Sequence, residues 1–249
     1  MQSDEQLSNP VLQAFIWGGV AAASLLIGFA ISGRGLSNRA VGIIMGIGSG
    51  ALLSAIAYEL VPESKLSGAG MAAAFCLGAI TFFGADWVID RRGGADRKDI
   101  AGTQPGGSGW AIFIGTLLDN IPESIILGMS LALGSTVNVA FLAAVFVSNL
   151  PEGVAGSVNL QVTGHSRRSI FWMWMVLVLI SAACAGLGYI LIRSLPSADG
   201  RFFQAFAAGA MLTMLADAMM PEAFEHGGNL VGLFTVMGFL AAAMLSIMQ

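Results

Sequence analysis

The chain has 249 residues, of which 56% are hydrophobic and only 10% are charged. Soluble domains carry about 25% charged residues, so this composition excludes an ordinary soluble domain and predicts a membrane protein with several spans. The formal net charge is −4 and the basic residues form no patch, which argues against nucleic-acid binding.

Eight apolar stretches follow one another along the chain, and each is long enough to cross a bilayer as a helix. The ten residues before the first stretch lack the positive charge of a cleavable signal peptide, so the first stretch is predicted to be a retained helix. The whole of 1–249 is interpreted as a single transmembrane domain. The predicted spans are 11–32, 40–61, 68–90, 110–133, 138–161, 170–192, 202–221 and 229–248.

The longest break between the apolar stretches is 91–109, where four basic residues precede a run rich in glycine and serine. This composition predicts a flexible, solvent-exposed loop. Lys and Arg residues gather in the loops on the same side as this one, and cytoplasmic loops are enriched in them. The sequence therefore predicts a multi-pass protein of the cell membrane with both termini outside the cytoplasm. The basic residues on the predicted cytoplasmic side are Arg34, Arg39, Arg91, Arg92, Arg97, Lys98, Arg167 and Arg168, against Lys65, Arg193 and Arg201 on the other.

Two short polar motifs interrupt the stretches 110–133 and 138–161 near their centres. Residues 119–124 read Asp-Asn-Ile-Pro-Glu-Ser, and 148–153 repeat the Asn-x-Pro-Glu core 29 positions later. Both motifs are predicted to lie at mid-membrane depth. Each proline removes a helical hydrogen bond, which frees the carbonyl group of Leu118 or Val147 and predicts a bend in the helix.

Helical spacing brings the polar side chains of each motif onto one face. Asp119 and Glu123 are four residues apart, as are Ser148 and Glu152, so each helix presents a short stripe of oxygen atoms. An ionised carboxylate at the centre of a membrane helix costs about 2.5–3.5 kcal/mol, and no Lys, Arg or His occurs in 99–164. The stripes therefore predict a bound cation, protonated carboxyl groups, or alternation between the two.

A second repeat relates the second and seventh apolar stretches. Residues 50–63 and 209–222 align without gaps and share six identities in fourteen positions. Successive helices cross the membrane in opposite directions, so these two segments run oppositely and the repeat is inverted. We therefore predict an all-α polytopic membrane protein with eight transmembrane helices, in which helices 1–3 and 6–8 form an inverted repeat around central helices 4 and 5. Such repeats around a polar midplane site are typical of alternating-access transporters.

These motifs resemble those of the ZIP (Zrt/Irt-like) family of metal-ion transporters. The helix 4 pattern of that family is His-Asn-x-Pro-Glu-Gly, which Asn120, Pro122 and Glu123 match, and its helix 5 carries a related Pro-Glu-Gly, which 151–153 match. The likeness covers nearly the whole chain and implies eight spans with both termini outside the cytoplasm. It also implies transport of a divalent cation of the zinc, iron or manganese class through a site between helices 4 and 5, with no prosthetic group.

The sequence departs from the family pattern at its site positions. Asp119 replaces the usual helix 4 histidine, and Ser148 with Asn149 replaces a helix 5 pair that often contains histidine or a carboxylate. Oxygen ligands favour hard cations such as Mn²⁺, whereas imidazole suits Zn²⁺, so the set is expected to lean toward hard ions. The residues expected to contact the metal along its path are Asp119, Asn120, Glu123, Ser148, Asn149, Glu152 and Asp217.

Other classes of membrane protein also place carboxylates in the bilayer. An intramembrane protease is not expected, because the sequence contains neither Gly-x-Gly-Asp nor His-Glu-x-x-His, and no other enzyme class is indicated. A cation channel and a proton-coupled carrier of a non-metal substrate remain alternatives to a metal carrier. Besides the metal ion and the lipid bilayer, the expected partner is a second copy of the chain in a homodimer.

Overall fold

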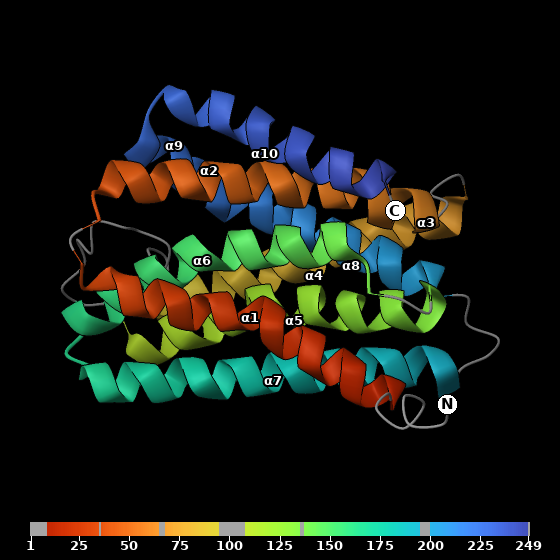
Figure 1. The fold of residues 1–249 in the computed structure, drawn as a ribbon, viewed down its shortest axis with the longest axis horizontal. Helices are drawn as coiled ribbons and strands as arrows, with labels where there is room; N and C mark the ends of the chain where they lie inside the picture. Colours follow the sequence, from red (N-terminus) through yellow and green to blue (C-terminus); the bar gives the residue numbers. More distant parts are fainter. Residues whose placement is uncertain are drawn as a thin grey trace, which may run out of the picture.

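The computed structural model describes residues 9–34, 36–64, 68–94, 108–134, 137–194 and 200–248, and these ranges contain helices and no strand (Figure 1). Within these described ranges, eight helical segments are long and apolar enough to cross a membrane, which confirms the all-α fold and the eight predicted spans of a multi-pass membrane protein. The helices are α1 Pro10–Ser32, α2 Asn38–Ala55, η1 Ile56–Leu60, α3 Val61–Ser64, α4 Ala69–Ile89, η2 Asp90–Gly94, α5 Gly109–Gly134, α6 Val139–Val162, α7 Arg167–Ser194, α8 Arg201–Met214, η3 Leu215–Met219, α9 Met220–Gly227 and α10 Leu230–Ile247.

Polar side chains at the predicted loop ends begin several of these helices. The side chains of Asn9 and Ser37 cap α1 and α2 by accepting hydrogen bonds from main-chain N–H groups in the first turn. Asn138 caps α6 in the same way, with its Oδ1 accepting from the N–H of Phe141 at 2.8 Å. Each of these apolar helices therefore starts at a specific residue.

Two of the predicted boundaries were wrong. The third span continues through η2 to Gly94, so Arg91 and Arg92 are helical and do not belong to the loop; the guanidinium of Arg91 lies 3.7 Å from the centre of the Trp87 ring. The seventh span continues through α9 to Gly227. The remaining part of the predicted loop, 95–107, lies outside the described residues.

The second and seventh spans share an irregular turn that the sequence pattern did not predict. Each contains a five-residue π-helical turn, η1 in the second span and η3 in the seventh. In the alignment of 50–63 with 209–222, these turns occupy the same positions, and each comes two residues before a proline. A π-helical turn inside a membrane helix often marks a functional site.

Pairs of glycines bring four pairs of helices into main-chain contact. A Cβ atom added to either glycine of a pair would lie 1.8–2.5 Å from the carbonyl oxygen of the residue three positions before its partner. Only a residue without a side chain permits this approach, which is a common way to pack membrane helices. The pairs are Gly28 of α1 with Gly153 of α6, Gly128 of α5 with Gly188 of α7, Gly50 of α2 with Gly238 of α10, and Gly78 of α4 with Gly209 of α8.

This contact pattern supports the predicted inverted repeat, which itself stays a prediction. In chain order, the eight spans begin with α1, α2, α4, α5, α6, α7, α8 and α10. The predicted repeat relates spans 1, 2 and 3 to spans 6, 7 and 8, and span 4 to span 5. Under this relation, the contact of α1 with α6 corresponds to the contact of α7 with α5. The contact of α2 with α10 likewise becomes that of α8 with α4. Each contact has its counterpart with the same three-residue offset.

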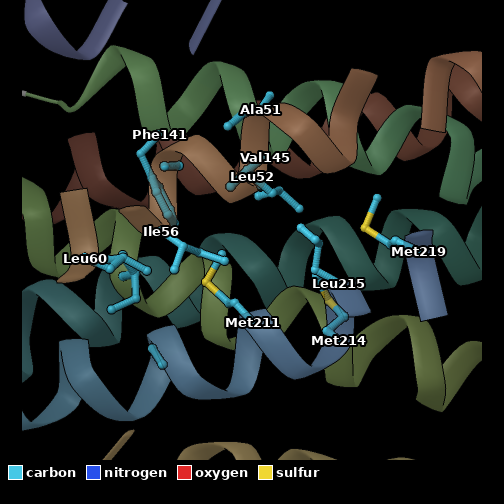
Figure 2. Close-up of a cluster of buried hydrophobic side chains, with 14 of the residues drawn as sticks. Ala51, Leu52, Ile56, Leu60, Phe141, Val145, Met211, Met214, Leu215 and Met219 are labelled. Carbon is cyan, nitrogen blue, oxygen red and sulfur yellow. The ribbon is translucent and has the colours of Figure 1, made fainter. Parts of the chain in front are cut away.

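The largest apolar core fills the space between α2 with η1, α6, and α8 with η3 (Figure 2). Met211, Met214 and Met219 are fully buried there beside Leu52 and Phe141. Methionine adapts to irregular gaps because it is unbranched and has three rotatable bonds. A second core surrounds Trp174 of α7, whose indole N–H donates to the hydroxyl of Ser157 on α6 at 2.9 Å.

Candidate metal site

The polar residues of the two central helices are buried as a group. Both carboxylates of α5, its Asn120, and their counterparts on α6 are at most 3% exposed. The side chains of each helix share one face because residues four apart lie on the same side of a helix. This spacing holds across each motif because both helices continue through their prolines. Six of the seven predicted residues therefore lie in the interior: Asp119, Asn120, Glu123, Ser148, Asn149 and Glu152.

An amide pair joins the two helices across this group. The side-chain N–H of Asn149 donates to Oδ1 of Asn120 at 3.1 Å, and the amide of Asn120 donates in turn to the main-chain oxygen of Thr116 at 2.9 Å. Oδ1 of Asn149 is buried and accepts no hydrogen bond from the residues that the structure describes. Buried polar atoms are normally satisfied, so this oxygen lacks the partner that most such atoms have.

The hydroxyl group of Ser148 is hydrogen-bonded to its own helix. Its hydroxyl donates to the carbonyl of Val145, three residues back on its own helix, at 2.9 Å. Its oxygen keeps acceptor capacity, but its proton is committed to the helix. Ser148 is therefore buried with the group, and its hydroxyl proton is used within α6.

Gly48 of α2 packs against the main chain of α6 at Ser148, a contact that the sequence did not predict. A Cβ atom on Gly48 would lie 2.8 Å from Cα of Ser148 and 3.3 Å from the carbonyl oxygen of Val147. That carbonyl is the one that Pro151 leaves without its usual helical donor. The α2 helix thus packs closely against α6 at the level of the buried polar group. The density of glycines in 42–50 was the available signal, but it did not show which glycine would face α6.

The structure does not add Asp217 to the buried group. Asp217 is exposed on η3, whereas the other six predicted residues are in the interior. Within the described ranges, no three side chains of His, Cys, Asp or Glu lie close enough together to hold a metal ion. A cation between α5 and α6 would therefore need amide or main-chain oxygens in addition to carboxylates.

A separate polar region lies at the end of the seventh span. His226 and Glu222 are one turn apart on α9, with Nδ1 of the imidazole 3.0 Å from a carboxylate oxygen. Beside them is a cavity of about 390 Å³ that Arg39, Glu225 and Asn229 help to line. This region lies where α2 and α10 begin and is distinct from the buried group on α5 and α6.

Comparison with known proteins gives no matching family model. "Putative zinc transporter At3g08650" of Arabidopsis thaliana is 27% identical over 196 residues, which cover 77% of this chain and 31% of the plant protein. "Zinc transporter ZIP11" of Bos taurus is 29% identical over 157 residues, which cover 58% of this chain and 46% of the bovine protein. The chain spans less than half the length of each relative. Similarity to two proteins that are both named as zinc transporters supports a ZIP-like family.

Proposed function

We propose that this protein is a ZIP-like transporter that moves a divalent transition-metal ion across the membrane through the buried group on α5 and α6. The observation that carries the proposal is the burial of three carboxyl groups and two amides on adjacent membrane helices. Polar groups inside a membrane are costly and usually functional. The similarity to two proteins named as zinc transporters points to the same cargo class.

The chemistry of the group favours a cation. Glu123 and Glu152 supply carboxylates from the two helices, and the sequence from 99 to 164 contains no basic residue. The buried Oδ1 of Asn149 adds an amide oxygen that accepts no hydrogen bond from the described part of the chain. Because imidazole and thiolate are missing from both motifs, the donors are all oxygen, and we expect Mn²⁺ and Fe²⁺ to compete well with Zn²⁺.

The burial of the group also favours a carrier over an open channel. Its six residues are at most 3% exposed, so an ion reaches them only after the helices move. A carrier that opens to one side at a time needs such a sealed state, whereas a conducting pore needs a continuous path. The proposal therefore includes saturable transport with a limited turnover rate.

The test is uptake of Zn²⁺, Mn²⁺, Fe²⁺ and Mg²⁺, each alone, into proteoliposomes that contain the purified protein, with protein-free vesicles as the control. We expect saturable uptake of at least one transition metal and mutual competition among those accepted. Uptake that rises linearly with concentration and large single-channel currents would indicate a channel. Failure to bind any of these metals at equilibrium would overturn the proposal and favour a proton-coupled carrier of another substrate.

A further inference from the structure

The carboxylate of Glu59 joins three separate elements at one end of the bundle. Glu59 lies on η1, the π-helical turn of the second span, and is partly buried. Its Oε2 accepts a hydrogen bond from the amide of Asn138 at 2.5 Å, and its Oε1 accepts one from the hydroxyl of Ser246 on α10. Both oxygens are thus engaged, so the group acts here as a tie between helices.

The hydrogen bond from Asn138 connects Glu59 to α6, the helix that carries half of the candidate site. The same Asn138 side chain that donates to Glu59 caps α6 through its Oδ1. The site residues Ser148, Asn149 and Glu152 follow on that helix. Glu59 therefore fixes the first turn of the site helix to the pair formed by α2 and α10, at the end of the molecule where α1 begins and α10 ends (Figure 1).

The opposite end of the bundle carries a carboxylate at the same level of the related crossing, but on the other helix of the pair. Glu59 is nine residues after Gly50, and Ser246 is eight residues after Gly238, its contact partner. Counting the same steps from Gly209 and Gly78 leads to Ala218 and to Asp86, whose side chain is only 4% exposed. Ala218 is thus the counterpart of Glu59, and Asp86 is the counterpart of Ser246. Each crossing has one carboxylate at this level, although packing alone does not require a carboxylate in a membrane helix.

We propose that Glu59 is a positioning residue that latches this end of the transporter closed by holding α6 against α2 and α10. This inference rests on the proposed function, because it assigns the latch to the path that leads to the site on α5 and α6. While the latch holds, the site stays sealed from this end. When its hydrogen bonds break, the start of α6 separates from η1 and α10 and the site opens toward this face.

The structure offers a substitution that breaks the latch without removing the helix cap. Asn138→Asp keeps an oxygen that caps α6 as well as asparagine does, but it replaces the donor to Glu59 with a second carboxylate. Glu59→Gln combined with Asn138→Asp restores a hydrogen bond with the donor and acceptor exchanged. The double variant is therefore the matched rescue of the single one.

The experiment measures thiol labelling with a membrane-impermeant reagent, in proteoliposomes and without any metal. The reporter is Ala144→Cys, which is buried on α6 between the latch and the site, in a background in which Cys76 and Cys184 are replaced by alanine. Ala155→Cys, which is buried on the same helix beyond Glu152, controls for general loosening. We expect Asn138→Asp to speed labelling at position 144 by about tenfold, in line with the loss of a hydrogen bond to a charged group, and to leave position 155 unchanged.

Two further results complete the test. The double variant should return labelling at position 144 to the wild-type rate, and Ser246→Ala, which leaves the α6 cap intact, should speed it by a few fold. Equal labelling in wild type, Asn138→Asp and Ser246→Ala would overturn the latch, as would a double variant as reactive as the single one. Because no metal is present, a failure of metal uptake would overturn the proposed function without deciding this test.

Discussion

The two Asn-x-Pro-Glu copies have nearly the same sequence but different surroundings. On α5, Asp119 precedes the core and Ser124 follows it; on α6 the corresponding residues are Ser148 and Gly153. Gly153 is required by packing, because a Cβ there would lie 2.5 Å from the carbonyl oxygen of Leu25 on α1. The glycine that serves this purpose on α5 is Gly128, one turn later.

The difference assigns unlike roles to the two copies. The α6 copy is fixed by close main-chain contacts, with α1 at Gly153 and with α2 behind Ser148. The α5 copy carries two carboxylates, and its Asn120 receives the hydrogen bond from α6. The proposed site would therefore draw two of its three carboxyl groups from α5 and one from the more tightly packed α6.

The largest expected effect comes from removing the glutamate that both copies share. Glu123→Gln and Glu152→Gln each replace a carboxylate by an amide of nearly equal volume, so packing persists while a strong cation ligand is lost. Each should lower the rate of metal uptake by at least about tenfold, since even groups that only support metal ligands contribute that much. Initial rates in proteoliposomes measure the effect.

Glu225→Gln is the matched control for these variants, because Glu225 is an exposed glutamate on α9. It should transport at close to the wild-type rate. If Glu123→Gln or Glu152→Gln transports as well as this control, the substituted residue is not a ligand. If only one of the two variants does so, the two glutamates have different roles.

A smaller effect tests the carboxylate that only α5 possesses. Asp119→His introduces an imidazole one turn from Glu123, and imidazole binds Zn²⁺ better than Mn²⁺. We expect Zn²⁺ to inhibit Mn²⁺ uptake at a several-fold lower concentration in the variant than in wild type. Identical inhibition curves would mean that Asp119 does not contact the metal.

The amide pair provides a third comparison, in which stability is measured. Asn120→Ala removes both the acceptor for Asn149 and the donor to the main-chain oxygen of Thr116, whereas Asn149→Ala removes only one hydrogen bond. Each buried hydrogen bond contributes about 1 kcal/mol, so Asn120→Ala should lower the free energy of unfolding more. The double variant should cost less than the sum of the two single ones, because they share a bond. Thermal unfolding in detergent measures all three, and strict additivity would show that the amides do not interact.

The smallest expected effect concerns Ser148, the counterpart of Asp119. Its hydroxyl proton is already donated to its own helix, so Ser148→Ala should change uptake by less than about twofold, as a short side-chain bond to the helix backbone contributes little. A loss as large as that of Glu152→Gln would show that this oxygen contacts the cargo.

Much of the fold was predictable because it depends on local composition. A bilayer requires about 20 apolar residues for each helix, so the eight spans and their order follow from windows of that length. The burial of the six candidate site residues was also predictable, since carboxylates and amides at mid-membrane depth avoid lipid. The position of Asp217 was not, because its place in the middle of a span does not reveal which side of the helix faces the interior.

The sequence by itself determined which segments cross the membrane and which of their polar groups need a partner, because the bilayer acts on each helix separately. Only the tertiary structure decided which helices meet and through which residues. Glycine contacts select the partners of α1, α2, α4 and α5 from many apolar faces that look alike in sequence. The two donors to Glu59 lie 79 and 187 positions away along the chain, and no local pattern relates residues at such separations, because only packing brings them together.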